Sequence, residues 1–112
     1  MSLCSFEGES RRHYDYRALE IKNRAAVPIG GGNYVFTRRV GGVFEVICAG
    51  ETDNLWGLFT SSLWHRAKLE YGATTPFVRA NPDKNSRRLE SEDIIRKYRP
   101  PMNEDMADTG NA

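Results

Sequence analysis

Two glycine-rich breaks, each followed by an alternating segment, limit the folds open to this chain more than any other feature. Gly30–Gly32 interrupt the chain, and Gly41-Gly42 separate residues 33–39 from residues 43–49. In both segments the side chains alternate with a period of two, which is the repeat of a β-strand, and paired glycines favour the tight turn of a hairpin. The sequence therefore predicts a β-hairpin over residues 33–49.

Further elements are predicted on both sides of this hairpin. Residues 14–27 indicate a short helix or turn that ends before a proline. After the hairpin, Thr52 or Asp53 can cap a helix that runs to about Tyr71, and Gly72 provides a C-terminal stop.

The last part of the chain predicts one more strand and one more helix. Thr74 to Ala80 fits a third strand, and Asn81-Pro82 fits the start of a helix that ends before Pro100. On this helix a mostly apolar stripe should face the sheet, with Glu90 and Glu92 pointing away from it to either side. The stripe consists of Ser91, Ile94, Ile95 and Tyr98.

These elements predict an α+β fold, with a small, three-stranded, mainly antiparallel sheet flanked by helices. At 112 residues the chain is expected to form one domain over residues 14–103. We expect residues 1–13 to be a flexible N-terminus. Residues 104–112 are expected to be a disordered acidic tail, because they combine small and acidic residues with no aromatic residue.

Charge and cysteine content restrict the function classes. Sixteen Lys and Arg against 15 Asp and Glu leave a net charge of +1, which gives no signature of nucleic-acid binding by itself. Cys4 and Cys48 lack a CxxC spacing, so neither a disulfide framework nor a zinc site is favoured. No apolar run approaches the length of a membrane span, and no signal peptide opens the chain. We therefore expect a cytoplasmic protein without a membrane partner.

Several short motifs occur in a specific order. Gly32-Asn33-Tyr34 lies on the first predicted strand, and Gly50 follows Cys48 at the end of the second. Ile94-Ile95 and the closing Pro100-Pro101-Met102-Asn103 lie on and after the last helix. Over about residues 28–103 this order resembles the GIY-YIG nuclease superfamily, whose fold is built on two such strands.

The resemblance implies where a catalytic site should lie. Tyr34 matches the tyrosine that activates or positions the attacking water, and the second motif's tyrosine falls at Cys48. The arginine that neutralises the scissile phosphate falls at Leu58, and the glutamate that holds a divalent metal falls at Ser91. Gly32, Gly50 and Asn103 match conserved motif positions of the family.

These replacements predict weakened chemistry. Leu58 carries no charge for the phosphate, and Ser91 is a poor sole ligand for Mg²⁺, which prefers carboxylate and water oxygens. Each lost transition-state contact lowers the rate by on the order of 10²–10³. The sequence therefore favours a catalytically degraded, GIY-YIG-like domain that binds DNA or RNA. The expected nucleic-acid contacts are Arg38, Arg39, Arg66, Arg87 and Arg88.

Two other functions remain open. An active endonuclease would use Mg²⁺ or Mn²⁺ with Tyr34, His65 and the nearby Glu90 or Glu92. A protein-interaction module, including a homo-oligomer, is favoured by the near-zero net charge and two tryptophans.

Each candidate also has a purely structural interpretation. Tyr34 would pack on a helix, Cys48 would be a small buried residue, and His65 would lie on a helix surface. Ser91 would be a small residue where two elements approach. Asn103 would hydrogen-bond to the backbone, and the arginines would be solvated.

Overall fold

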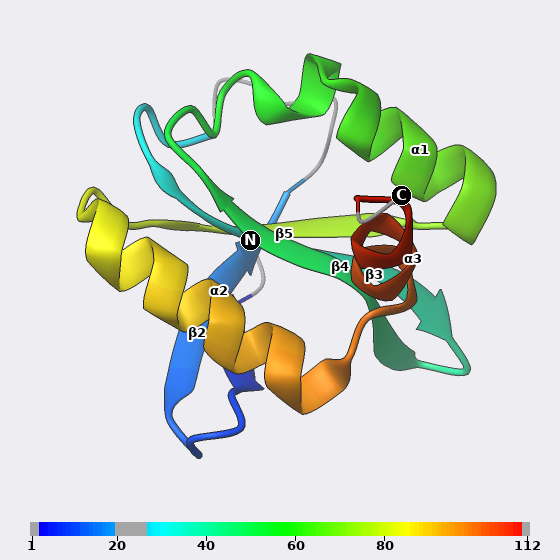
Figure 1. Cartoon of the computed structure of the whole chain (residues 1–112), viewed down its shortest axis with the longest axis horizontal. Coiled ribbons are helices and arrows are strands. Elements are labelled where there is room, and N and C mark those ends of the chain that lie inside the picture. The colour runs from blue at the N-terminus through cyan, green and yellow to red at the C-terminus, as the bar shows by residue number, and fades with distance from the viewer. Residues whose placement is uncertain (1–2, 20–26, 111–112) are drawn as a thin grey trace.

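The computed structural model describes residues 3–19 and 27–110, and the fold is α+β (Figure 1). Five strands form one antiparallel sheet in the order β1-β2-β5-β3-β4. The strands are β1 (Leu3–Glu7), β2 (His13–Ala18), β3 (Gly32–Val40), β4 (Val43–Thr52) and β5 (Thr75–Ala80). The helices are a short 3₁₀ turn, η2 (Leu58–Thr60), and α1 (Ser62–Tyr71), α2 (Lys84–Tyr98) and α3 (Pro101–Gly110).

The prediction of three strands is wrong, because the N-terminal residues add two more. Residues 3–7 form β1, where a flexible segment was expected, and residues 13–18 form β2 rather than a helix or turn. The part of that expected helix over residues 20–26 lies outside the described residues. At the other end, the expected disordered tail is helical as far as Gly110.

The hairpin predicted around the two glycines is confirmed. Gly41 and Gly42 have φ values of 56° and 81° and join β3 to β4. The register shifts after the Phe36–Cys48 pair, because Thr37 pairs with Val46 and leaves one extra residue in β4. This β-bulge fixes the register of the second motif strand.

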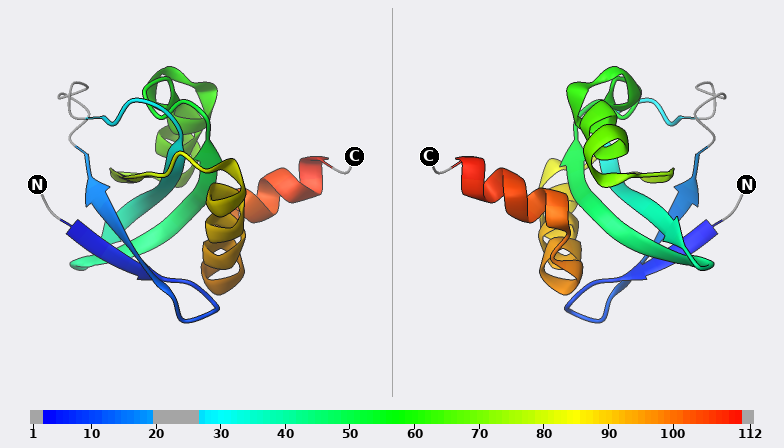
Figure 2. Two further views of the ribbon diagram at one scale, coloured as in Figure 1. Left: turned by 90° about the vertical axis from the view of Figure 1, so that its left-hand side faces the viewer. Right: turned by 90° about the vertical axis from the view of Figure 1, so that its right-hand side faces the viewer.

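The sheet has a buried core on each face, and Figure 2 shows it curling between α1 and α2. Phe36, Cys48 and Trp64 belong to the cluster on the α1 side. Phe77 and Ile94 belong to the cluster on the α2 side. Both faces of the central strands are therefore covered, which explains why β3 is almost continuously buried from Gly32 to Thr37.

The helix ends follow the capping chemistry only in part. Gly72 ends α1 in the left-handed conformation, as predicted, with a φ of 70°. However, α1 begins at Ser62 rather than near Asp53. The N-cap of α2 is Asp83, whose side chain accepts a hydrogen bond from the Asn85 amide, so α2 begins slightly later than predicted. No helix among the described residues is long and apolar enough to cross a membrane.

Candidate functional site

Tyr34 and Gly50 form the centre of the motif region. They are paired on β3 and β4, and the Tyr34 hydroxyl lies so close to Gly50 that a Cβ atom there would overlap it. The Tyr34 side chain is 8% exposed, and its ring packs 4.9 Å from that of Phe36. Burial, reinforced by Cys48 and Glu51, raises the pKa of Tyr34, so the hydroxyl stays protonated at neutral pH.

Cys48 is the residue that the sequence resemblance assigned to the second motif tyrosine. Its side chain is fully buried, and burial raises its pKa to about 12 although Arg66 acts in the opposite direction. A thiol with such a pKa is not a nucleophile at neutral pH. The interpretation of Cys48 as a small buried residue is confirmed.

Leu58 and Ser91 are the residues that the sequence resemblance assigned to the phosphate-binding and metal-binding positions. Leu58 is buried in η2 as part of the core on the α1 side. Ser91 is buried on α2, one turn before Ile94. Both positions are therefore filled by neutral side chains. Gly32 is also closely packed, since a Cβ atom there would overlap Leu55 and the backbone of Arg79.

His65 and Asn103 both lie outside the pair of Tyr34 and Gly50: His65 on the surface of α1, and Asn103 against the edge of β4. His65 is exposed on α1, in agreement with the surface interpretation. Asn103 binds the edge of β4, because its Oδ1 accepts from the Ala49 amide at 2.8 Å and its Nδ2 donates to the Ala49 carbonyl at 2.9 Å. The prediction that Asn103 bonds to backbone is confirmed, and the contact holds the first turn of α3 against β4.

Four of the five candidate nucleic-acid arginines are paired with carboxylates. The pairs are Arg38–Glu45 at 2.9 Å, Arg66–Glu70 at 3.1 Å, Arg87–Glu51 at 2.9 Å and Arg88–Glu92 at 3.0 Å. Arg87 is 5% exposed and also donates to the carbonyls of Asn81 and Pro82, so it serves the fold rather than the surface. Arg39 is exposed and lies 5.5 Å over the ring of Phe44.

Glu90 and Glu92, the candidate metal ligands, do not converge on one site. Glu90 does not point away from the sheet as predicted, because it is 4% exposed and accepts from Tyr16 Oη at 2.5 Å and Arg79 Nε at 3.1 Å. Glu92 pairs with Arg88 on the helix surface. Within residues 3–19 and 27–110 no three acidic, histidine or cysteine side chains form a metal-binding cluster. These residues do not fit an Mg²⁺ or Mn²⁺ site.

A second polar centre, which the motif comparison missed, joins the N-terminal hairpin to α2. Asp93 is 5% exposed and accepts from the Ser10 amide at 2.8 Å, from Ser10 Oγ at 2.6 Å and from Tyr14 Oη at 2.7 Å. Tyr16 reaches Glu90 one turn earlier on α2. The alternation of Tyr14, Asp15, Tyr16 and Arg17 was the sequence signal for this strand.

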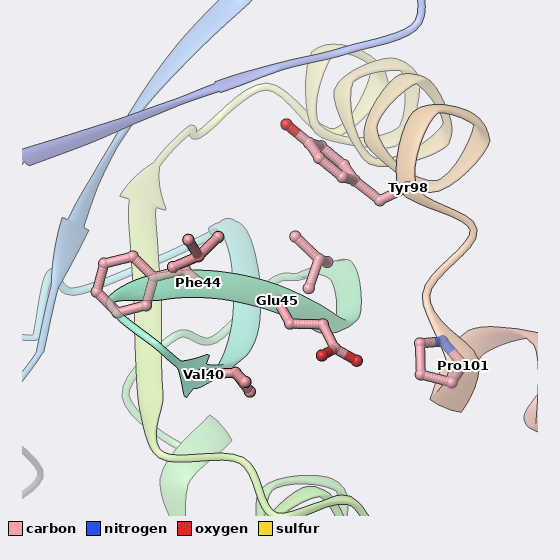
Figure 3. A pocket seen from close by; sticks show the side chains of 7 residues that line it. Val40, Phe44, Glu45, Tyr98 and Pro101 are labelled. Carbon is pink, nitrogen blue, oxygen red and sulfur yellow. The ribbon is translucent and has the colours of Figure 1, made fainter.

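A groove runs beside β4, the edge strand at this end of the sheet. It has a volume of about 440 Å³, and Figure 3 shows Phe44 and Glu45 on one side with Tyr98 and Pro101 on the other. Val40 and Val43, at the tip of the hairpin, are 52% and 68% exposed. The groove is mainly apolar and follows a strand edge.

Comparison of the chain with protein-family models, curated proteins and solved structures gives no match. What the chain does must therefore be inferred from its own residues.

Proposed function

We propose that the chain is a GIY-YIG-like domain that has lost phosphodiester hydrolysis and binds nucleic acid. The observation that supports the loss of chemistry is the burial of neutral side chains at the family-equivalent positions. Leu58 and Ser91 supply neither a cation nor a carboxylate, and Cys48 replaces the second tyrosine. Of the four expected catalytic positions, Tyr34 keeps the family side chain, but a tyrosine without a charged partner for the phosphate cannot stabilise the transition state of phosphoryl transfer.

The proposed nucleic-acid surface lies where the end of β3 meets the last turns of α1. It is defined by Arg38, Arg39, Arg66 and Lys68. The Arg38 side chain packs beside Gly72, since a Cβ atom on that glycine would lie 3.4 Å from Arg38 Cδ. Lys68 lies 5.7 Å over the ring of Trp64. The approach of Arg38 to Gly72 brings the end of β3 beside the end of α1.

The charge balance of this surface predicts weak binding. Two of its four cations pair with Glu45 and Glu70, so only part of the positive charge is available to phosphates. Exposed ion pairs contribute little free energy and can exchange partners. Binding through such contacts should be independent of sequence and should weaken steeply with salt.

Fluorescence anisotropy with labelled branched DNA, duplex DNA and duplex RNA tests this proposal. At low ionic strength the wild type should bind, and Arg39→Gln/Arg66→Gln should bind at least about tenfold more weakly. Arg17→Gln/Arg96→Gln removes the same charge elsewhere and serves as the control. No binding by the wild type, or equal losses in the two variants, would refute the proposed surface.

Loss of chemistry is tested separately with supercoiled plasmid and branched DNA in Mg²⁺ or Mn²⁺. We expect no nicking by the wild type. Nicking that disappears in Tyr34→Phe would overturn this part of the proposal and support the alternative of an active endonuclease.

The groove beside β4 favours a second candidate function, self-association through the sheet edge. Asn103 already binds both backbone groups of Ala49 as a neighbouring strand would, while the hairpin end of β4 lies beside the apolar groove. The segment Val43–Ile47 of a second copy is itself extended and apolar, and two-fold pairing of edges gives a closed dimer. Sedimentation velocity should then show dimers that Val43→Lys abolishes. A monomer at every concentration would exclude this function.

A further inference from the structure

A pocket of about 400 Å³ lies where the β1–β2 turn, β5 and the start of α2 meet. None of the residues in the proposed nucleic-acid surface lines it. Its wall includes Arg12, Tyr14, Arg79, Ser86, Leu89 and Glu90. Asp83 and Asn85 line it as well, so the pocket combines two arginines with two carboxylates, of which that of Glu90 is buried, and a partly apolar side.

The acceptors in this wall are largely committed to the protein. Glu90 uses one carboxylate oxygen for Tyr16 and the other for Arg79. Asp83 caps the Asn85 amide, and the Asn85 side-chain oxygen accepts from Arg88. Likewise, Ser86 Oγ accepts from Asn81 at 3.2 Å.

The donors, in contrast, remain available. Arg79 donates through Nε to Glu90, and its side chain is 38% exposed. Among the described residues its terminal nitrogens Nη1 and Nη2 form no hydrogen bond. Arg12 is exposed, and its side chain forms no ion pair or hydrogen bond with any residue in the described ranges. A pocket with occupied acceptors and open cationic donors suits an anion.

We propose that this pocket binds a phosphate group. Two guanidinium forks offer more donors than the two oxygens of a carboxylate can accept, whereas a phosphate presents enough oxygens for both. The Glu90 contact holds the Arg79 guanidinium, and the Tyr14 ring lies 6.0 Å from its central carbon. The exposed side chain of Leu89 and the Tyr14 ring would contact the organic part of the ligand. The phosphate belongs either to a free nucleotide or to the end of a nucleic-acid strand.

Amide chemical shifts of the ¹⁵N-labelled protein test the proposal and show in the same spectra whether each variant is folded. The probes are inorganic phosphate, a nucleoside 5′-monophosphate, and one oligonucleotide with either a 5′-phosphate or a 5′-hydroxyl. We expect the phosphate-bearing probes to shift the amides of Asn85 and Ser86. A 5′-phosphate requirement in the oligonucleotide would identify a strand end, and binding of the mononucleotide alone would identify a free ligand.

Arg12→Gln should weaken phosphate binding at least about tenfold, whereas Arg17→Gln on the neighbouring strand should leave it unchanged. Arg79→Lys keeps a cation beside Glu90 but removes the fork, and it should weaken binding to a similar extent. No shifts with any phosphate probe, or equal affinity in Arg12→Gln and Arg17→Gln, would overturn the proposal. It does not depend on the proposed nucleic-acid surface, because Arg39→Gln/Arg66→Gln should bind phosphate normally.

Discussion

Asp93→Asn tests the contact that joins the N-terminal hairpin to α2. The Asp93 carboxylate is buried and accepts three hydrogen bonds, two from Ser10 and one from Tyr14. The substitution keeps the shape of the side chain but removes its charge and replaces one acceptor oxygen with an NH₂ group, so the Ser10 and Tyr14 hydroxyls lose a charged acceptor. The hairpin would therefore lose part of its attachment without any change in volume.

The expected loss follows from the number of affected bonds. A hydrogen bond to a charged group contributes about 1.5–3 kcal/mol, and the neutral amide is cheaper to bury than the carboxylate. We expect the free energy of unfolding to fall by about 2 kcal/mol, which for a domain of this size lowers the Tm by roughly 10 °C. Tyr14→Phe removes one donor only and should cost about 1 kcal/mol.

Urea unfolding at neutral pH measures these free energies in both single variants and in the double variant. Asp15→Asn, on the exposed side of β2, is the matched control and should change the free energy by less than about 0.5 kcal/mol. The double variant should lose less than the sum of the singles, because the two side chains share one hydrogen bond. An Asp93→Asn variant as stable as the control, or losses that add in the double variant, would contradict the hydrogen bond that the two side chains share.

The wild type and Asp93→Asn should also differ in how their stability depends on pH. Burial alone would raise the pKa of Asp93, but the Ser10 and Tyr14 hydrogen bonds and the charge of Arg96 outweigh it, and the pKa is lowered. The folded state therefore favours the ionised carboxylate. Its contribution is present above the ordinary aspartate pKa of about 3.9 and is lost as the pH falls through the lowered value. The stability gap between wild type and Asp93→Asn should narrow in acid, and a gap that widens would contradict this sign.

Three further changes probe other contacts. Gly50→Ala should lower the free energy of unfolding by about 1–3 kcal/mol, because the added Cβ overlaps the Tyr34 hydroxyl; urea unfolding with no loss would contradict that contact. Cys48 should resist alkylation in the native protein while the half-buried Cys4 reacts, since Cys48 is fully buried with a pKa of about 12. Timed labelling read by mass spectrometry checks this, and equal rates would refute it. Asn103→Ala should cost about 1–2 kcal/mol and speed amide exchange in α3, because two backbone hydrogen bonds to β4 are lost; unchanged exchange would show that α3 is held otherwise.

Local sequence signals predicted the elements whose ends depend on local chemistry. Gly41-Gly42 located the hairpin, and Gly72 located the end of α1, because positive φ is favourable for glycine. The N-terminal strands were missed because β1 is short and β2 is interrupted by charged residues. Their burial comes from partners far along the chain, such as Phe77 for Phe6. The β-bulge in β4 was not predicted either, because one extra residue in a strand does not change the amino-acid composition in a recognisable way.

The candidate site shows the same division between local and long-range information. Counting along the chain predicted neutral side chains at two expected catalytic positions, Leu58 and Ser91, and the structure shows that both residues are buried. It could not show that Glu90 faces Tyr16 and Arg79, because that side chain turns inward only to meet residues from two other strands. Partners of buried polar groups are set by tertiary packing, which a single helix pattern does not contain.

The surroundings of Tyr34 and the pocket beside α2 differ in how many of their polar groups are left without a hydrogen-bond partner. Near Tyr34, Glu51 is bound by Arg87, and Arg87 is further bound to two backbone carbonyls. Polar groups satisfied in this way stabilise the fold but have little capacity left for a substrate. At the start of α2 most acceptors are satisfied, whereas the Arg12 side chain and the outer face of Arg79 are exposed to solvent. A surface recognises a ligand through the groups that folding leaves unsatisfied, and among the residues lining the proposed phosphate pocket these include the guanidinium groups of Arg12 and Arg79.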